Sequence, residues 1–436
     1  MSDILSRPGA VCEPGAGILD VAARDAWGGL SGTRSAGSRM AAALQEYFAE
    51  VEGRFATTPD LAVGLEEEFQ LLEPETLILT QRFEELRDAA DGDLATAIAG
   101  ELIASEIEVR TPRCATFAEA AMRLAERREA LLRLAHLHGV TLGATATHPF
   151  SSWRDQRIID TPHYRVVEET LKYVAWRNNT WSTHLHVGIR GVDRAVVLCD
   201  ALRGYLPHLL ALSANSPFVE DTWTELHSAR AQTFIRMFPR CCIPDLFGSW
   251  AEHRRFYEQL VTTNCIRDFT ELWWSVRPHH AFGTVEVRIC DAQTELWQTL
   301  AVQSLTYALV ATLAHEYDLG RVLPVLETRY VEENLWRAIR YGLDGKLVDF
   351  RRGRELPATD AVRELLEYVW PAAERLGVRP FIGNVERLLR EGNGAQRQVA
   401  DHVAGASLRE AFAGTVERLR DEQRVPLAGC VAGGGV

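Results

Sequence analysis

The stretch that decides the fold is Gly64-Leu65-Glu66-Glu67-Glu68-Phe69-Gln70-Leu71-Leu72, where three consecutive acids interrupt an apolar run. Successive side chains of a strand point to opposite faces. Glu66 and Glu68 therefore share one face, the apolar residues share the other, and Glu67 is the exception. Two carboxylates on one face repel each other unless a cation lies between them, and a divalent cation with oxygen ligands meets that need. The alternative is an edge strand protected from pairing by its charges.

Three further segments repeat this alternation. A strand expected over 105–112 alternates apolar residues with Glu106, Glu108 and Arg110. One over 183–189 places His184 and His186 opposite an unbroken apolar face, and one over 283–291 alternates apolar residues with Glu286 and Arg288. A lone strand histidine is more often a satisfied core or surface residue than a ligand, but two histidines on the same face favour a ligand role.

All four strands thus place apolar residues on one face and acids, histidines or arginine on the other. Neighbouring strands lie about 4.7 to 4.9 Å apart, so a curved sheet would gather the polar groups in one concavity, with helices packed on its apolar side. Burying so much charge is costly without cations. We therefore expect two or more divalent metal ions, Mg²⁺ or, because histidine contributes, Mn²⁺. Zinc-dependent hydrolysis is the competing interpretation.

The segment 229–244 is a candidate phosphate-binding loop. It carries Arg230, Arg236 and Arg240 in an otherwise acidic protein, and guanidinium groups match phosphate oxygens. A solvated loop is the alternative. Metals held by carboxylates beside arginines suit phosphoryl transfer, in which catalysis is mostly positioning and charge neutralisation. Because the sequence has no G-x-G-x-x-G and no G-x-x-x-x-G-K-[ST] motif, metals and side chains would hold any nucleotide.

Composition excludes several classes of partner. The 436 residues are 47% hydrophobic and 25% charged, and 47 Lys and Arg against 60 Asp and Glu give a formal net charge of -13. This balance argues against binding to nucleic acid or to an anionic membrane. Eight scattered cysteines without a C-x-x-C pair, and no apolar run of about 18 residues or basic, apolar leader, predict a cytoplasmic protein.

The chain divides into three parts. Residues 1–45 are rich in Gly, Ala and Ser and predict a flexible N-terminal arm. Residues 46–425 predict a single catalytic domain, in which a long apolar helix over 293–317 must be buried and the segment after 327 is mostly helical. Residues 426–436 predict a disordered tail.

Together these motifs resemble the carboxylate-amine ligases of the glutamate-cysteine ligase type 2 family. The resemblance spans about residues 61–400. It rests on the motifs at 64–69, 108–112, 184–188, 213–218, 286–291, 333–337, 340–344 and 392–398. It implies an α+β, glutamine-synthetase-like fold, with a curved antiparallel β-sheet and helices packed on its outer face. It also implies ATP-dependent amide formation through an acyl phosphate, as a homodimer or a higher homo-oligomer.

The resemblance further implies roles for particular residues. Glu66, His184 and Glu286 would share one metal ion, and Glu68 and Glu108 would hold another. Arg288, together with Arg230 or Arg236, would contact ATP and the transferring phosphoryl group, and His186 would contact the substrate or the acyl phosphate. The small-molecule substrates would be a carboxylate, by default glutamate, and an amine, by default cysteine. The alternatives are a metal-dependent hydrolase of an amide or phosphoester that uses the same residues, and a non-catalytic binding protein.

Overall fold

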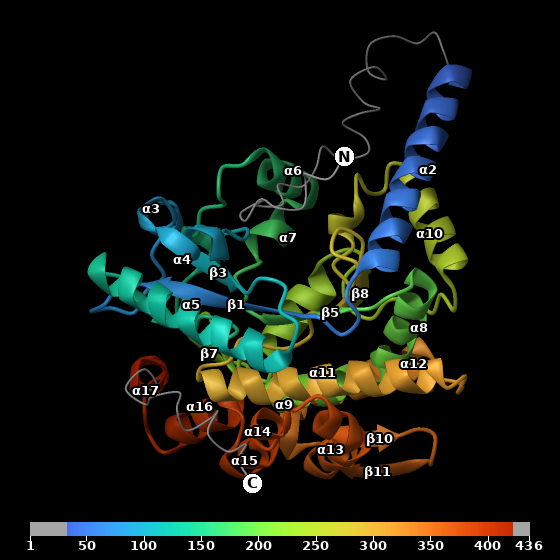
Figure 1. Cartoon of the computed structure of the whole chain (residues 1–436). Coiled ribbons are helices and arrows are strands. Elements are labelled where there is room, and N and C mark those ends of the chain that lie inside the picture. Colours follow the sequence, from blue (N-terminus) through green and yellow to red (C-terminus); the bar gives the residue numbers. More distant parts are fainter. Residues whose placement is uncertain (1–32, 422–436) are drawn as a thin grey trace.

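The structure is a computed structural model that describes residues 33–421. Its central element is an antiparallel sheet whose strands do not follow one another in sequence order. Its strands follow the order β2-β3-β1-β5-β9-β8, and β4 pairs with one end of β1 (Figure 1). Their bounds are β1 Val63–Leu72, β2 Ile98–Ala99, β3 Glu106–Arg110, β4 Thr141–Gly143, β5 Thr183–Gly188, β8 Val276–His279 and β9 Thr284–Val287. Two small hairpins complete the strands: β6 Phe218–Val219 with β7 Thr222–Trp223, and β10 Lys346–Asp349 with β11 Arg354–Pro357.

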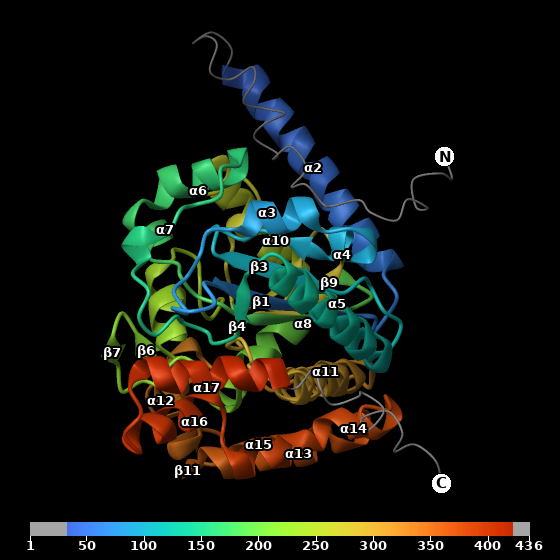
Figure 2. The same cartoon turned by 90° about the vertical axis from the view of Figure 1, so that its left-hand side faces the viewer.

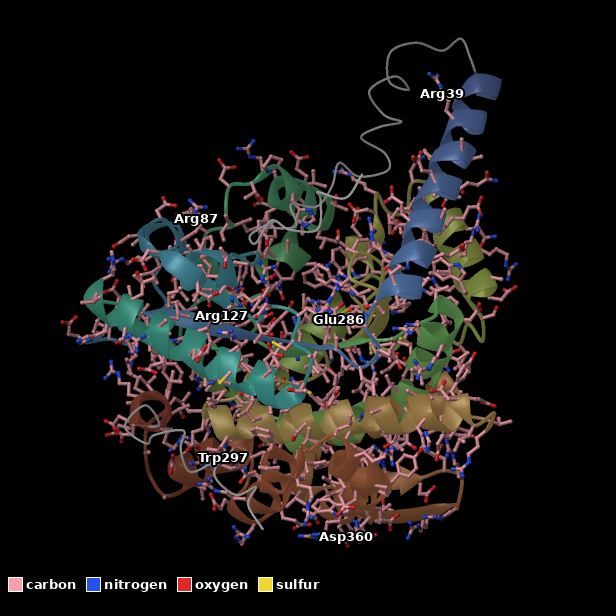
Figure 3. All side chains as sticks on the ribbon, in the orientation of Figure 1. Arg39, Arg87, Arg127, Glu286, Trp297 and Asp360 are labelled. Carbon is pink, nitrogen blue, oxygen red and sulfur yellow. The ribbon has the colours of Figure 1, made fainter. Side chains whose placement is uncertain are left out.

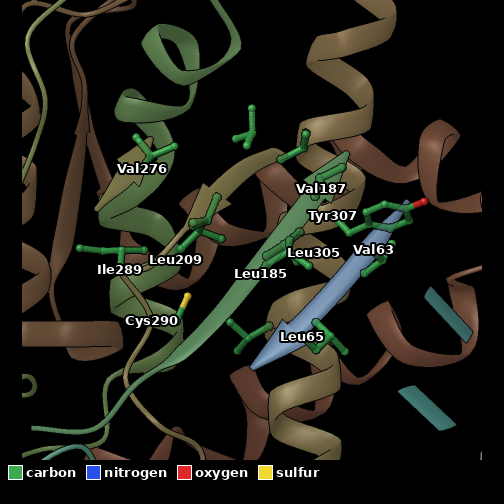
Figure 4. Packing of buried hydrophobic residues seen from close by; sticks show 14 of the residues in the cluster. Val63, Leu65, Leu185, Val187, Leu209, Val276, Ile289, Cys290, Leu305 and Tyr307 are labelled. Atoms are coloured by element: carbon green, nitrogen blue, oxygen red, sulfur yellow. The ribbon is translucent and has the colours of Figure 1, made fainter. Parts of the chain in front are cut away.

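The register of the sheet aligns the four predicted alternations. Leu65 pairs with Leu185, which pairs with Val287, and Val287 pairs with Val276. All four side chains are buried on the same face, and several of them pack together in Figure 4. Because the side-chain period of a strand is two, this register places every second residue of each strand on the opposite, polar face.

Helices cover the apolar face in two layers. Helix α5 (Phe117–Leu137) packs on β1, α8 (Val192–Leu202) packs on β8, and α11 (Leu296–Asp318) crosses beneath β5. A second layer lies on the far side of α11 (Figures 1 and 2). This layer contains α9 (Leu206–Ser213), α12 (Thr328–Tyr341), α13 (Ala358–Arg375), α14 (Arg379–Ile382), α15 (Asn384–Glu391) and α16 (Gly394–Val403).

The remaining helices surround this core. They are α2 (Thr33–Thr57), α3 (Phe83–Ala89), α4 (Gly92–Ala97), α6 (Pro162–Leu171), α7 (Tyr173–Trp176), α10 (Trp250–Thr262) and α17 (Leu408–Asp421). Short helical turns are η1 (Trp153–Asp155), η2 (Arg203–Tyr205), η3 (Ala231–Ile235), η4 (Phe269–Glu271) and η5 (Gly342–Asp344). Figures 1 and 2 show α6 and α7 on the opposite side of the sheet from α11, which is the polar side.

Helix α11 is the buried helix expected over 293–317. All residues from Gln298 to Ala314 are buried, so the helix has no exposed polar face. Its polar side chains bond to the sheet instead: Gln303 Nε2 donates to Thr183 Oγ1 at 3.1 Å, and Thr299 Oγ1 donates to a Glu67 carboxylate oxygen at 2.5 Å. The helix therefore links β1 and β5 through hydrogen bonds on the apolar face of the sheet.

Glu67, the acid that breaks the alternation, lies on the buried face and is paired there. Its Oε1 lies 2.7 Å from Arg128 Nη1 of α5, and both side chains are about 4% exposed. The Arg128 guanidinium also stacks over the Phe69 ring, 5.2 Å from its centroid. A buried carboxylate is tolerated only when it is paired and hydrogen-bonded, so this ion pair explains the third acid of the run.

Strand β8 was missed by the sequence analysis, because Pro278 lies within it and its residues do not alternate regularly. As the last strand of the sheet order, β8 can accommodate a proline. The β8–β9 turn needs Gly283, whose φ is +66° and whose position would bring a Cβ within 3.0 Å of the Arg54 carbonyl oxygen. Strand β9 is also shorter than the strand predicted over 283–291.

One predicted domain boundary, the end of the N-terminal arm at residue 45, falls within the described residues. Helix α2 begins at Thr33, inside the predicted arm of residues 1–45, and its Leu44 is buried against the body. Residues 33–45 are therefore helical, whereas residues 1–32 and the predicted tail at 426–436 lie outside the described residues. A single catalytic domain over 46–425 stays a prediction. The segment Val192–Ser213 is long and apolar enough to cross a membrane, but 78% of its most apolar window is buried as core.

The Glu67–Arg128 pair gives a stability prediction. Glu67→Ala should lower the free energy of unfolding by roughly 3 kcal/mol, because it removes a buried, hydrogen-bonded carboxylate that faces the Arg128 guanidinium. Urea unfolding would measure this. The control, Glu129→Gln, removes an exposed i,i+4 pair with Arg133 on the same helix and should change stability by less than about 0.5 kcal/mol. Equal effects of the two substitutions would contradict the assignment.

Candidate active site

The strand register gathers the predicted site residues on the polar face of the sheet. Glu68 on β1 pairs with Glu108 on β3, and Glu66 on β1 pairs with His184 on β5. His186 on β5 then pairs with Glu286 on β9. Side chains directly opposite each other on neighbouring strands have Cβ atoms about 4.5 to 5.5 Å apart. Residues separated by more than 200 positions in the chain therefore meet in three adjacent cross-strand pairs on one face of the sheet.

Glu66, His184 and Glu286 form the first group that could hold a metal ion. One ligand atom from each lies within 4.8 Å of the other two. His184 Nδ1 is 3.0 Å from Glu66 Oε2, so the imidazole is fixed in front of the carboxylate.

Glu68, Glu108 and His184 form a second such group, again with ligand atoms within 4.8 Å of one another. His184 Nε2 is 3.6 Å from Glu68 Oε1 and 2.8 Å from Ser182 Oγ. The Ser182 hydroxyl donates to Glu68 Oε2 at 2.8 Å, and the Ser182 backbone N–H donates to the same oxygen at 2.5 Å. Ser182 thus orients both Glu68 and His184, in the way that outer partners orient metal ligands.

The structure therefore brings together the five residues for which a metal role is predicted. Carboxylates and one imidazole suit Mg²⁺ or Mn²⁺ by the chemistry of their donor atoms. Burial of several carboxylates side by side, with few hydrogen-bond donors between them, also fits a bound cation. That these residues bind metal stays a prediction.

Glu101 is a further carboxylate of this cluster, and the sequence analysis missed it. It lies in the loop before β3, outside any strand alternation, so no pattern marked it. Burial, together with the charges of Glu68 and Glu66, raises the pKa of Glu101 to about 7. Burial and neighbouring acids also raise the pKa values of Glu106 and Glu108 well above their usual range. Without a cation, this side of the cluster therefore binds protons more readily than ordinary carboxylates do.

The other side of the cluster is cationic. Arg277 on β8, also missed because its strand was missed, places Nε 2.5 Å from Glu286 Oε2. Arg288 Nη1 lies 2.5 Å from Glu286 Oε1. Burial opposes ionisation of Glu286, but the two guanidinium groups and His186 outweigh it and hold its pKa well below the usual range.

His186 lies between the two sides of the cluster. Its Nε2 is 3.3 Å from Glu66 Oε1 and 3.8 Å from Glu286 Oε1, and its Nδ1 is 3.0 Å from Thr284 Oγ1. Burial lowers the pKa of His186, but the charges of Glu66 and Glu286 outweigh it, so that the pKa is raised overall. For Glu66 in turn, burial raises the pKa, but His186 and His184 outweigh it and hold the pKa well below its usual range.

The structure separates the arginines of the predicted phosphate loop from the cluster. Arg230 is buried, and its guanidinium donates to the carbonyl oxygens of Arg288 and Ile289 and lies 3.4 Å from Asp291 Oδ1. Arg236 instead pairs with Glu332 of α12 at 3.3 Å. Arg230 therefore supports the backbone that carries Arg288. A phosphate contact by Arg230 or Arg236 stays a prediction.

Known structures share this fold. A bifunctional glutathione synthetase from Pasteurella multocida matches with a TM-score of 0.59 and 14% identity, covering 87% of this chain and 54% of that chain. The chain thus spans about half the length of the Pasteurella protein. A glutamate–cysteine ligase from Francisella tularensis, solved with AMP, matches with a TM-score of 0.54 and 13% identity, covering 86% and 95% of the two chains. The α+β, glutamine-synthetase-like ligase fold expected from the sequence is confirmed.

Sequence comparison assigns the family. The model described as glutamate-cysteine ligase family 2 (GCS2) matches residues 62–422, and the chain belongs to that family. A Solibacter usitatus protein named "Putative glutamate--cysteine ligase 2" is 39% identical over 78% of this chain and 89% of its own length. A Rubrobacter xylanophilus protein named "Putative glutamate--cysteine ligase 2-3" is 41% identical over 82% and 97%. The predicted enzyme class, an ATP-dependent ligase, is therefore confirmed.

The raised pKa of Glu101 predicts a pH-dependent stability. Between the usual glutamate value and about 7, the folded chain binds a proton that the unfolded chain has lost, so stability falls as pH rises. Glu101→Gln removes this proton uptake and keeps the shape of the side chain. Without metal, the melting temperature of the variant should therefore rise relative to that of the wild type between pH 5 and about pH 7.

Melting curves recorded in EDTA at several pH values would measure this difference. Glu75→Gln, an exposed acid in the turn after β1, is the control and should follow the wild type at every pH. A difference between Glu101→Gln and the wild type that does not change with pH would contradict the buried, protonated state of Glu101.

Proposed function

We propose that this ligase joins a small carboxylic acid to an amine at the expense of ATP, through an acyl phosphate. The observation that carries the proposal is the cluster of polar side chains on one face of the sheet. It has carboxylates and imidazoles at one end and Arg277 and Arg288 at the other. Neutralising the charge of a transferring phosphoryl group is the main task in such a reaction. The arginines can do so at one end of this cluster, and divalent cations held by the carboxylates would do so at the other.

The residues that would hold divalent cations are Glu66, His184 and Glu286 in one group and Glu68 and Glu108 in the other. Bound Mg²⁺ or Mn²⁺ would neutralise the phosphate oxygens of ATP and stabilise the charge that develops in transfer. Ser182 would keep Glu68 and His184 in place.

The proposed reaction has two steps. An oxygen of the substrate carboxylate attacks the γ-phosphorus of ATP, and the bond to ADP breaks. The neutral amine then attacks the acyl carbon, inorganic phosphate leaves, and the amine nitrogen loses a proton. Phosphorylation is needed because a carboxylate is a poor electrophile and has no good leaving group.

The side chains divide this work between them. Arg288 is 18% exposed at its side chain, more open than Arg277 at 8%, so Arg288 would meet the phosphoryl group while Arg277 orients Glu286. His186 carries a raised pKa and can donate from Nε2 to a substrate or acyl-phosphate oxygen. Arg230 would act through the Arg288 backbone. Arg236 could reach a phosphate only by leaving Glu332.

The names of the relatives supply the default substrates, glutamate as the acid and cysteine as the amine. We place the reaction in the cytoplasm, where the six described cysteines, all unpaired, would stay reduced. A homodimer or a higher homo-oligomer is also proposed. The net charge of -13 gives no support for a nucleic-acid partner. Family membership does not favour the hydrolase alternative.

An assay of ADP release tests this function. With Mg²⁺ or Mn²⁺, ADP should appear only when both an acid and an amine are present, and mass measurement should show the amide. A panel of amino acids and amines, with glutamate and cysteine first, would identify the pair. Amide formation without nucleotide, or hydrolysis that needs metal alone, would contradict a ligase.

Substitution of Glu286 tests the site. Glu286→Gln should lower kcat by at least roughly 100-fold, because the side chain loses the charge that faces Arg277, Arg288 and His186. Glu66→Gln should have a similar effect. The control Glu129→Gln, on the far face of the sheet, should keep wild-type activity. Full activity of Glu286→Gln, with an unchanged melting temperature, would remove this residue from the mechanism.

A further inference from the structure

A cavity of about 840 Å³ lies in the second helical layer, away from the ligase site. It is bounded by η2 and α9, the end of α11, the segment 322–326, the β10–β11 hairpin and α13. Figure 3 shows Glu286 of the ligase site on one side of α11 and Asp360, at the start of α13, on the other. Small-molecule sites usually have volumes of about 300 to 1,000 Å³, so this cavity has the size of a ligand site.

The wall formed by the β10–β11 hairpin is firmly held. Asn334 of α12 is buried, its Nδ2 donates to the Val348 carbonyl at 2.9 Å, and its Oδ1 accepts from the Val348 N–H at 2.8 Å. Asn334 belongs to the motif at 333–337, which the ligase site does not use. Through Asn334, the motif therefore fixes the position of the β10–β11 hairpin beside this cavity.

The interior of the cavity is aromatic and apolar. The rings of Tyr205 and Tyr368 are stacked, with centroids 6.2 Å apart and an angle of 9° between planes. Leu347, Leu356 and Leu365 add buried apolar surface. Such a surface favours a flat or branched apolar group.

Most charged groups around the cavity already have partners. Glu316 accepts from the Tyr368 hydroxyl at 3.0 Å. Asp349 lies 3.4 Å from Arg354, and Glu364 also pairs with Arg354. Arg352 faces both of these acids, at 3.5 and 3.4 Å.

Two charged groups of opposite sign remain. Arg351, beside the Tyr205 hydroxyl, and Glu367, next to Tyr368 in sequence, both line the cavity. Within residues 33–421 neither side chain forms an ion pair with another residue. A cation and an anion that have no ion-pair partner among residues 33–421, beside an aromatic surface, match a molecule that carries both charges.

We propose that this cavity is a second small-molecule site, and that its ligand is a free amino acid with an aromatic side chain. The ring packs against Tyr205 and Tyr368, the α-carboxylate binds Arg351, and the α-ammonium binds Glu367. This site does not depend on the proposed ligase reaction, because it shares no residue with the polar cluster on the sheet.

Binding of L-phenylalanine to the full chain, followed by isothermal titration calorimetry, tests the proposal. Three matched probes each lack one feature: 3-phenylpropionate lacks the amine, phenethylamine lacks the carboxylate, and L-alanine lacks the ring. Each should bind at least tenfold more weakly than L-phenylalanine, because each lost charged hydrogen bond or buried ring is worth a factor of ten or more.

Variants locate the binding. Arg351→Gln and Glu367→Gln, both at exposed positions, should each weaken L-phenylalanine binding about tenfold or more. Ala361→Leu, which adds bulk to the cavity wall, should weaken it as well. Arg363→Gln, at a half-buried position of α13 outside the cavity lining, is the control and should bind as the wild type does. Glu286→Gln should also retain binding, because it alters only the ligase site.

Three results would overturn the proposal. The first is no heat of binding with L-phenylalanine at millimolar concentration. The second is equal binding of L-phenylalanine and either probe that lacks one charge. The third is binding that is lost in Glu286→Gln but kept in Arg351→Gln and Glu367→Gln, which would place the ligand in the ligase site.

Discussion

Repulsion between carboxylates on the polar face of strands β3, β1, β5 and β9 is the constraint on which the rest of the structure depends. Glu66, Glu68, Glu106, Glu108 and Glu286 are held in a few rows by strand register, and Glu101 joins them from a loop. Charges of one sign this close to each other destabilise a fold unless they are neutralised. The carboxylate charges are neutralised in different ways at the two ends of the sheet.

At the β9 and β8 end, the chain supplies its own positive charge through Arg277, Arg288 and His186, and Glu286 is ionised. At the β3 end, Arg110 lies 3.1 Å from Glu108, but burial and the neighbouring acids raise the pKa values of Glu106 and Glu108 and favour their protonated forms. A divalent cation would replace those protons. The two ends of the site therefore differ in charge, with arginines beside Glu286 at one end and carboxyl groups of raised pKa beside β3 at the other.

Packing on the apolar side of the sheet stabilises the fold against this concentration of charge. Helix α11 is buried along most of its length and bonds to β1 and β5 through Thr299 and Gln303. Behind the site, Asp291 accepts from Asn215 N–H, Ser216 and Ser228. It also faces Arg230, which holds the Arg288 carbonyl. Motifs that do not touch the polar face therefore act by fixing the backbone that carries it.

Much of the fold and of the site could be predicted from local sequence alone. Alternation with a period of two separated Glu66, Glu68, Glu108, His184, His186 and Glu286 from the apolar residues beside them, because each strand must bury one face. The register of the folded sheet then places these residues next to one another. Arg277 and Glu101 escaped prediction, since an edge strand that contains a proline and a loop before a strand have no such pattern.

The sequence by itself therefore determined which side chains face the same way, because that property is local to each strand. Only the tertiary structure decided which of them meet, which arginine reaches an acid, and that Arg236 turns instead to Glu332 of α12. It alone also revealed the cavity between α9, α13 and the β10–β11 hairpin. Contacts of this kind join residues that are far apart in the chain, and their geometry depends on how whole elements pack rather than on any periodic pattern.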